Sequence, residues 1–324
     1  MTTPAPHDAP GTTLVVPAED AGRRLDDFLA DALAVGRRAA VRLASRVRVN
    51  GRHARKGDRL QGGDVLTVPP TDAATDLPAD ASVAVLRETP DVVVLDKAAG
   101  LPTVALRGAG GDSLAARIAV RFPECAAVGE PGECGLVHRL DTGTSGLLLA
   151  ARTSAAYAAL RTQFRTHAVT KEYLALVAGR LEHAERIDAP IGQHRASLRR
   201  VRAIAAPDAA RRYAARDACT DVVPERILRD ATVVRARTST GARHQIRVHL
   251  ASVGHPLLGD PLYGDSGRGG DDGFLLHASR IEWTDPATGL RTCDEAPLPP
   301  AWHERIERLD LDDRAAERAR PGPR

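Results

Sequence analysis

The chain has 324 residues, a net charge of +3 and only 3% aromatic residues. This length allows one sizeable domain and a smaller one, with cores built mainly from Leu, Val, Ile and Ala. The four cysteines show no Cys-x-x-Cys pair and no zinc-like spacing, which excludes a disulfide-rich scaffold. No segment has the apolar length of a membrane span, and residues 1–11 lack the pattern of a signal peptide. We therefore expect a soluble cytoplasmic protein with free thiols.

Positive charge is concentrated between residues 36 and 60, where Asp58 is the only acidic residue. Guanidinium groups form forked contacts with phosphates, so such a cluster suits nucleic acid. A coding bias towards arginine would explain the choice of Arg over Lys, but it would not explain the clustering. The basic residues are Arg37, Arg38, Arg42, Arg46, Arg48, Arg52, Arg55, Lys56 and Arg59.

The first seventy residues show a compact order of elements. Apolar residues at helical spacing predict a helix over 23–33, and the basic stretch after it is a second helical candidate. Asn50-Gly51 predicts a tight hairpin, and 62–68 supplies a returning strand. This order resembles the S4 RNA-binding domain, which implies RNA contacts for Arg37, Arg38 and Arg42. We expect a disordered N-terminus over 1–16, an S4-like domain over 17–70 and a linker over 71–82.

The rest of the chain is expected to form a second domain over 83–308, followed by a flexible tail over 309–324. Val92–Leu95 predicts a buried strand, and a helix capped by Ser154 carries the apolar stripe Tyr157, Leu160 and Phe164. Residues 171–177 predict a strand, and 244–253 a short helix capped by Ser239 or Thr240. The glycine-rich segment 265–273 is expected to be a mobile loop.

A lone carboxylate, Asp141, follows His138-Arg139-Leu140 and precedes a glycine-rich turn and an apolar strand. A well-positioned carboxylate is a candidate nucleophile, although an Asp in a turn often only bonds its own backbone. Asp-Thr-Gly-Thr is also the shape of an aspartic-protease turn. That chemistry needs two carboxylates that share one proton, and the chain holds a single Asp-Thr-Gly. This count argues against a protease.

Four motifs occur together along residues 83–300. They are His138–Gly146, Lys171–Ala175, His244–Leu250 and Gly254–Gly264. Together they resemble the motifs of the RluA-type pseudouridine synthases, which isomerise uridine in structured RNA. The resemblance implies an α+β fold whose catalytic domain has a largely antiparallel mixed sheet.

The resemblance also implies roles for individual residues. Asp141 would be the catalytic carboxylate, Tyr173 would lie against the target base, and Arg247 would pair with Asp141 and keep it ionised. Arg139 would fill the gap that a flipped uridine leaves. Further RNA contacts are expected from His138, Arg243, Arg199 and Arg200, the last two within a basic cluster where the family carries a β-hairpin.

Two departures from the family pattern affect the surroundings of the site. The family's Lys-Pro-x-Gly is Lys97-Ala98-Ala99-Gly100 here, and its Gly-Arg-Thr-His-Gln is Gly241-Ala242-Arg243-His244-Gln245. The first alters a turn, and the second moves an arginine by one position.

We expect no metal and no cofactor, because the reaction is redox-neutral and His244 and His249, five residues apart, do not stack on a helix as a metal pair would. RNA is the expected partner, with large-subunit ribosomal RNA as the target and transfer RNA as the alternative. A binding protein of the S4 type with no enzyme attached would show the same first seventy residues, but it would leave the other motifs unexplained. We expect a monomer.

Overall fold

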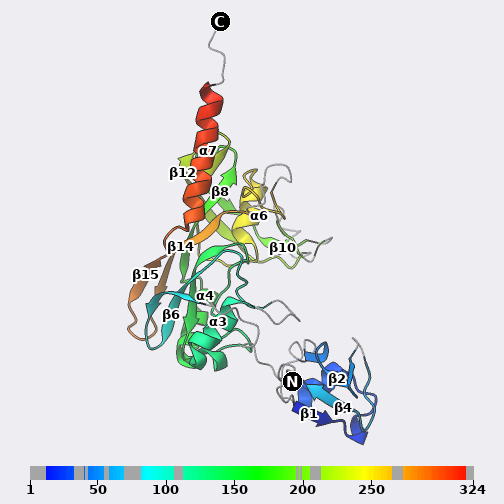
Figure 1. Ribbon diagram of the computed structural model, residues 1–324. Helices are drawn as coiled ribbons and strands as arrows, with labels where there is room; N and C mark the ends of the chain where they lie inside the picture. The colour runs from blue at the N-terminus through cyan, green and yellow to red at the C-terminus, as the bar shows by residue number, and fades with distance from the viewer. Residues whose placement is uncertain are drawn as a thin grey trace, which may run out of the picture. The chain divides into compact units, whose positions relative to one another are not determined.

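The computed structural model describes residues 12–32, 40, 43–54, 58–68, 82–105, 112–194, 197, 199–204, 213–264 and 273–318, with the backbone alone for 12 and 311–318. Two compact units are present (Figure 1): Met1–Asp80 with Ala105–Asp112, and Ala81–Val104 with Ser113–Arg324. We call them the N-terminal unit and the C-terminal unit.

The N-terminal unit contains a four-stranded antiparallel sheet in the order β1-β4-β2-β3. Asn50 and Gly51 join β2 to β3 with positive φ angles of 50° and 80°, the conformation that an Asn-Gly hairpin requires. The predicted hairpin is therefore present. The elements are β1 (Thr12–Val15), η1 (Ala18–Asp20), α1 (Leu25–Ala32), β2 (Arg48–Val49), β3 (Arg52–His53) and β4 (Val65–Val68).

The start of this unit corrects one boundary. Residues 12–16 were expected to belong to a disordered N-terminus, but β1 pairs with β4 and Val16 is only 1% exposed. The run Thr-Thr-Leu-Val-Val is rich in β-branched residues, which fit a pleated half-buried strand. Leu25, Phe28 and Leu29 of α1 are buried in the same small core. The candidate RNA contacts Arg37, Arg38 and Arg42 and the linker over 71–81 lie outside the described residues.

The C-terminal unit is built on a nine-stranded sheet in the order β5-β6-β7-β14-β8-β13-β12-β9, with β15 paired to β14. Among its neighbouring strands only β7 and β14 run parallel, so the sheet is mixed and largely antiparallel, as expected. Its strands are β5 (Ala84–Glu88), β6 (Val92–Lys97), β7 (Ser145–Ala151), β8 (Thr170–Ala178), β9 (Glu185–Asp188), β12 (Cys219–Ile227), β13 (Ala231–Thr238), β14 (Leu276–Thr284) and β15 (Arg291–Glu295). β10 (Ile191–Gln193) and β11 (Val201–Ala203) form a separate antiparallel hairpin.

Within the described part of this unit, five helical segments accompany the sheet: α3 (Leu114–Arg121), η2 (Pro123–Ala127), α4 (Ser154–Arg165), α6 (Gln245–Ser252) and α7 (Pro300–Arg318). The cap of α4 is Thr153, whose hydroxyl accepts from the Ala156 N–H at 3.2 Å, rather than Ser154. The tail from 309, expected to be flexible, continues α7 to Arg318. Its Asp, Arg, Ala and Glu residues include strong helix formers, which explains the difference. No helix in the described ranges is long and apolar enough to cross a membrane.

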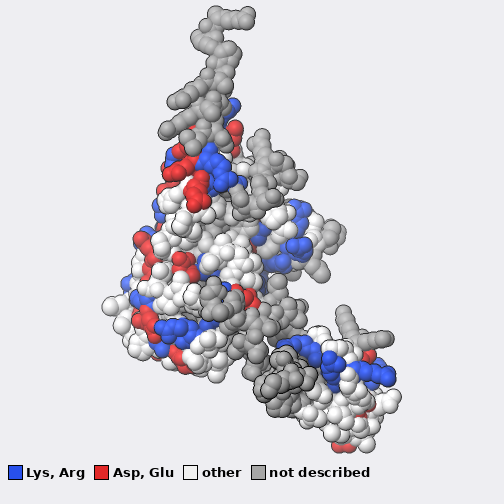
Figure 2. All heavy atoms as spheres, viewed as in Figure 1, with Lys and Arg blue, Asp and Glu red and all other residues white. Residues whose placement is uncertain are grey.

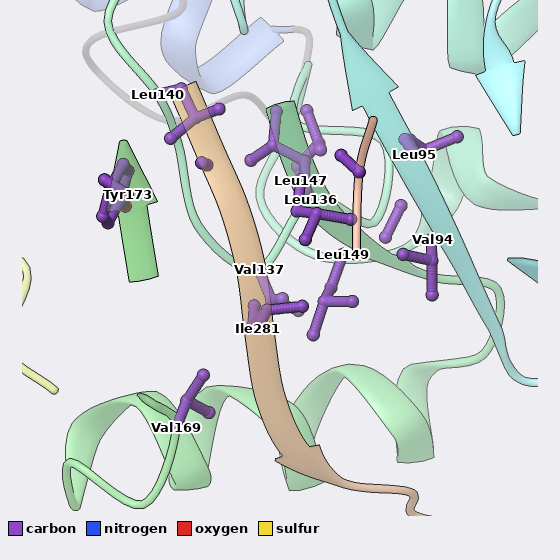
Figure 3. Packing of buried hydrophobic residues seen from close by; sticks show 14 of the residues in the cluster. Val94, Leu95, Leu136, Val137, Leu140, Leu147, Leu149, Val169, Tyr173 and Ile281 are labelled. Carbon is purple, nitrogen blue, oxygen red and sulfur yellow. The ribbon is translucent and has the colours of Figure 1, made fainter. Parts of the chain in front are cut away.

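The main core lies along the strands that precede and follow the Asp141 motif. Val94 and Leu95 of β6 and Leu147 and Leu149 of β7 are at most 1% exposed and pack with Ile281 of β14. Burial of such a side chain contributes roughly 1.5–3 kcal/mol relative to exposure. Figure 3 shows this packing together with Leu136, Val137, Leu140, Val169 and, on β8, Tyr173. The start of β7 is therefore fixed by a well-packed sheet.

Candidate active site

Asp141 lies on the tight turn that leads into β7. The Thr144 N–H donates to the Asp141 carbonyl at 3.0 Å, and the Asp141 side chain is 24% exposed. On the preceding residue, Leu140, both backbone groups bond the Thr103 hydroxyl, which donates to the carbonyl at 2.7 Å and accepts from the N–H at 3.2 Å. Buried backbone groups satisfied in this way fix the entry to the turn. The carboxylate is thus held on a rigid support while part of it faces solvent.

Lys97, at the end of β6, secures the other side of the turn. Its side chain is fully buried, and its ammonium donates to the carbonyls of Ala98, Leu101 and Thr142 at 2.9, 2.8 and 3.2 Å. Burial lowers the pKa of Lys97 to about 8, although the charges of Asp141 and Asp96 oppose the shift.

The variant turn Lys97-Ala98-Ala99-Gly100 therefore keeps two anchors. The second is Gly100, whose N–H donates to the Thr142 carbonyl at 2.8 Å and whose φ is +86°. The departure at Ala98 leaves both contacts intact. Sequence reasoning treated Lys97 only as a piece of this turn.

Arg247 of α6 connects Asp141 to a second buried carboxylate, Asp260. Its Nη1 donates to Asp141 Oδ2 at 2.8 Å, while Nε and Nη2 donate to the two oxygens of Asp260 at 2.8 and 2.7 Å. The guanidinium also lies against the rings of Tyr263 and Phe274, 5.3 and 4.5 Å from their centroids. This is a forked ion pair with one extra N–H directed at the candidate catalytic oxygen.

The electrostatics of the pair follow from its burial. Arg247 and Asp260 have side chains that are 6% and 0% exposed. Burial alone would raise the pKa of Asp260, but the bonds from Arg247 and from the backbone N–H groups of Leu262 and Tyr263 hold it below its ordinary value. Burial alone would lower the pKa of Arg247, but its bonds to Asp260 and Asp141 and their charges raise it above its ordinary value. Both groups are therefore charged at neutral pH.

Asp260 is a site residue that the sequence analysis missed. Its available signal was its place in the last quoted motif, directly after Gly259. Gly259 has a φ of +79°, and a Cβ there would lie 2.4 Å from the Gly273 carbonyl oxygen. The glycine thus permits the close backbone approach beside which Asp260 turns inward.

Tyr173 lies on β8, where Tyr173, Ala175 and Val177 are all buried. Burial and the nearby charge of Asp141 raise the pKa of the Tyr173 phenol above its ordinary value. The hydroxyl consequently stays protonated at neutral pH, so it can donate a hydrogen bond as well as accept one. None of the described residues forms a hydrogen bond with it. The structure therefore joins Arg247 to Asp141 and places Tyr173 near enough for the charge of Asp141 to act on its phenol.

His138 and Arg139 have different surroundings. The His138 ring stacks on Phe164 at 4.6 Å, and its Nε2 accepts from the Leu149 N–H at 3.1 Å. Burial, together with the charges of Lys171 and Arg161, lowers the pKa of His138 to about 3. Arg139 is exposed, and no described residue forms an ion pair or hydrogen bond with it. The imidazole is thus engaged within the protein, while the neighbouring guanidinium faces solvent.

The three other candidate RNA contacts lie beside the β10–β11 hairpin. Arg199, Arg200 and Arg243 are exposed. Arg243 donates to the Arg199 carbonyl at 3.1 Å, and Arg200 donates to the Leu262 carbonyl and lies over the Tyr263 ring at 5.8 Å. Their chain segments therefore meet, and the hairpin touches the turn that carries Asp260.

The helix that carries Arg247 does not begin as predicted. Its cap is His244, with a left-handed φ of 53°, and neither Ser239 nor Thr240 caps it directly. Instead the Gln245 side chain accepts from the Ala242 N–H and the Thr240 hydroxyl, each at 3.0 Å. At Ala242, where the sequence departs from the family pattern, only the backbone N–H takes part in this contact.

His249, the other histidine of this helix, is used structurally. Its Nδ1 lies 2.8 Å from the Thr220 hydroxyl and its Nε2 lies 2.9 Å from the Ala189 carbonyl. Burial lowers its pKa. Both ring nitrogens therefore have partners inside the protein.

Comparison with known proteins identifies the family. Residues 91–252, which include Asp141, Tyr173 and Arg247, match the family model of RNA pseudouridylate synthases. A ribosomal large subunit pseudouridine synthase D from Xanthomonas campestris is 35% identical over 97% of this chain and 98% of its own length. Another from Pseudomonas aeruginosa is 32% identical over 88% and 91%. The chain belongs to the RNA pseudouridine synthase family, of the RluA type. It is an isomerase of uridine in RNA.

A solved structure supports the same fold. Human RNA pseudouridylate synthase domain containing 1 superposes with a TM-score of 0.54 at 23% identity, covering 76% of this chain and all of the human one. The α+β fold expected for the catalytic domain is thereby confirmed.

Proposed function

We propose that this pseudouridine synthase uses Asp141 as its catalytic carboxylate on a uridine of large-subunit ribosomal RNA. The observation that carries the proposal is the arrangement of Asp141, Arg247 and Asp260. Arg247 occupies one oxygen of Asp141, and Asp260 holds Arg247 in place with two bonds. One oxygen of a fixed carboxylate is left for the substrate, as a nucleophile or base requires.

The reaction breaks the bond from ribose C1′ to uracil N1 and forms a bond from C1′ to C5. The C5 proton leaves and N1 gains a proton, so no atom is lost and no electron donor or acceptor is needed. Water must be kept from C1′, because water that reached this carbon would hydrolyse the bond. Glycosidases carry out that hydrolysis with a water molecule and two carboxylates. We assign this exclusion to the packed wall that holds Tyr173, whose protonated hydroxyl can donate a hydrogen bond to the base.

The uridine must leave its stack before it reaches Asp141. Extrusion of a nucleotide costs a few kcal/mol, and an inserted side chain can occupy the space it vacates. Arg139 suits this role because it is exposed, two residues before Asp141, and without an ion-pair partner among the described residues.

RNA outside the site would be held by two basic regions (Figure 2), one on the N-terminal unit and one beside the β10–β11 hairpin. In the basic stretch of the described N-terminal unit, Arg46, Arg48, Arg52 and Arg59 are exposed. Beside or on the hairpin, the exposed arginines include Arg199, Arg200, Arg202, Arg216 and Arg243. We propose that the N-terminal unit is an S4-like RNA-binding domain that also uses Arg37, Arg38 and Arg42.

The target follows from the curated relatives named above, which are called ribosomal large subunit pseudouridine synthases. We take large-subunit ribosomal RNA as the substrate, with transfer RNA as the alternative, and we place the enzyme in the cytoplasm as a monomer. Pseudouridine mapping in both RNA classes, from cells with and without the gene, tests this assignment. Complementation with Asp141→Asn should restore none of the missing sites. Restoration by that variant would remove Asp141 from its role.

The binding role of the N-terminal unit has its own test. Each lost phosphate contact should flatten the dependence of log affinity on log salt by roughly 0.7 to 0.9. Changing Arg37, Arg38 and Arg42 together to Ala should weaken RNA binding most at low salt and leave saturating turnover on a short stem-loop near the wild-type rate. Normal binding with an unchanged salt slope would mean that these arginines only solvate the surface.

A further inference from the structure

His244 stands out because it combines a strained backbone with a side chain directed at the catalytic carboxylate. It is the cap of α6 in the left-handed conformation, with a φ of 53°. Non-glycine residues seldom adopt this conformation, and those that do are often found at functional sites. Its side chain is only 10% exposed, and its Nε2 lies 3.8 Å from Oδ1 of Asp141. That oxygen is the one that Arg247 leaves free.

The hydrogen bonds around Tyr263 favour one position for the proton of the His244 ring. The Val201 N–H donates to the Tyr263 hydroxyl oxygen at 3.0 Å, and that oxygen lies 2.9 Å from Nδ1 of His244. Within the described ranges, the phenol proton has no other acceptor than Nδ1. Tyr263 is half-buried, and a hydroxyl proton held away from water is costly to leave unpaired, which favours donation from Tyr263 to Nδ1. The proton of the neutral ring is then on Nε2, facing Asp141.

The charges that face His244 favour this neutral form. Burial and, less strongly, the nearby cations Arg247 and Arg243 lower the pKa of His244 to about 4, against the opposing charges of Asp141 and Asp260. At neutral pH the ring is therefore a hydrogen-bond donor without a charge. The 3.8 Å separation is too long for a hydrogen bond between His244 and Asp141 themselves. The Nε2–H is thus available to an acceptor that lies against Oδ1.

We propose that His244 donates from Nε2–H to an acceptor oxygen of the target nucleotide, either the ribose 2′-oxygen or the uracil 2-carbonyl, bound against Asp141. Tyr263 holds the required tautomer. The inference rests on the proposed function of Asp141. It also connects the basic hairpin to the site, because Val201 belongs to β11 and Arg200 lies over the Tyr263 ring. RNA bound at the hairpin therefore lies beside residues that contact Tyr263, and Tyr263 orients the His244 ring.

Nitrogen NMR of the free enzyme tests the tautomer without any RNA. The wild-type protein should show His244 protonated at Nε2 alone. Tyr263→Phe should give a mixture of tautomers, because the phenyl ring keeps the packing and loses the donor. A wild-type ring protonated at Nδ1, or a tautomer unchanged by Tyr263→Phe, would overturn the proposal.

Single-turnover kinetics test the contact with substrate. His244→Asn suits the left-handed backbone but is too short to reach, so it should lower the rate about 10- to 100-fold, the loss expected for a hydrogen bond made in the transition state. RNA affinity should stay within threefold. His244→Gln should recover part of the rate, because its amide extends about as far as Nε2.

The matched control is His167→Asn, because His167 is also left-handed, with a φ of 57°, but is exposed. It should leave the rate unchanged. A wild-type rate for His244→Asn, or equal losses for the Asn and Gln variants, would refute the contact.

Modified RNA identifies the acceptor. A substrate with 2′-deoxyuridine at the target lacks the ribose 2′-oxygen, and one with 2-thiouridine lacks the uracil 2-carbonyl oxygen. The acceptor is the oxygen whose removal abolishes the difference in rate between wild type and His244→Asn. If neither reduces that difference, the proposal is wrong. An Asp141→Asn variant assayed in parallel separates the two hypotheses. Turnover by Asp141→Asn defeats the proposed function, whereas an inactive Asp141→Asn beside a fully active His244→Asn defeats only this inference.

Discussion

Asp141 and Asp260 share Arg247, yet the structure predicts opposite consequences for their removal. Asp260 is fully buried and accepts four hydrogen bonds, two from Arg247 and two from the backbone N–H groups of Leu262 and Tyr263. Breaking a buried pair by removing one partner costs about 3–5 kcal/mol. Because Asp141 still pairs with Arg247, we expect Asp260→Asn to lower the free energy of unfolding by about 3 kcal/mol, the lower end of that range.

Asp141→Asn should cost much less. The Asp141 side chain is 24% exposed and makes one bond to Arg247, which keeps its forked pair with Asp260. A single charge-assisted bond at a partly exposed site contributes about 1 kcal/mol. We therefore expect an inactive but stable Asp141→Asn protein, and a destabilised Asp260→Asn protein whose folded fraction keeps reduced activity through a less firmly held Arg247.

Urea unfolding followed by tryptophan fluorescence measures this contrast directly. Both tryptophans of the chain, Trp283 and Trp302, are buried in the C-terminal unit, so their signal reports on the unit that holds the site. The dependence on urea should be unchanged, with only the midpoint shifted. Equal losses for the two variants, or a loss below about 1 kcal/mol for Asp260→Asn, would refute the assignment of Asp260 as the main partner of Arg247.

The pH dependence of that gap has a definite sign. A carboxyl group whose folded pKa is lowered contributes stability above its ordinary pKa and loses it as the pH falls through the folded value. The ordinary value for Asp260 is 3.8, and its folded pKa lies below that. The difference between wild type and Asp260→Asn should therefore be complete at neutral pH and shrink only below about pH 4.

Two further predictions concern His138 and Gly146. In the unfolded chain His138 binds a proton below its ordinary pKa of 6.5, whereas the folded protein keeps the ring neutral to about pH 3. The stability advantage of wild type over His138→Gln should therefore shrink on acidification below pH 6.5, by at most about 1.4 kcal/mol per pH unit. A stability difference that does not change with pH in urea titrations would contradict the buried neutral ring. Gly146 has a φ of +107°, and a Cβ there would meet the Ala278 backbone oxygen at 2.3 Å. Gly146→Ala should therefore disrupt the β7–β14 pairing and lower the melting temperature. The control is Gly289→Ala, which should lower it far less, because at a φ of +70° its Cβ meets nothing within 4 Å. Similar melting temperatures for the two variants would show that the close approach is readily relieved.

The strongest sequence patterns predicted local structure well. Asn50-Gly51 fixes its hairpin because both residues tolerate positive φ, and Val92–Leu95 forms a strand because a short apolar run fits a sheet buried on both faces. The boundaries were less predictable. Strand β1 depends on its pairing with β4, some fifty residues later, and the polar tail extends α7 because helix propensity needs no apolar face. The expected mobile loop over 265–273 falls almost entirely outside the described residues.

The site shows the same division between local and long-range information. The motifs indicated Asp141, Tyr173 and Arg247, because each sits within a distinctive run of residues. Asp260 and Lys97 were missed because their roles depend on burial and on partners far along the chain, such as Thr142 for Lys97. His138 shows the reverse case. Its place in the motif suggested RNA contact, while the structure has its ring stacked on Phe164 and bonded to the Leu149 backbone.

Asp260 explains how Arg247, a flexible side chain, can hold the Asp141 carboxylate in a fixed position. A free Arg side chain has about 2 kcal/mol of rotamer entropy to lose on ordering. Asp260 removes that freedom during folding, because its fork fixes two guanidinium nitrogens before RNA arrives. The remaining N–H then meets Asp141 at no further ordering cost. With Tyr263 and Phe274 against the guanidinium, substrate can approach the free oxygen of Asp141 without displacing the cation bound to its other oxygen.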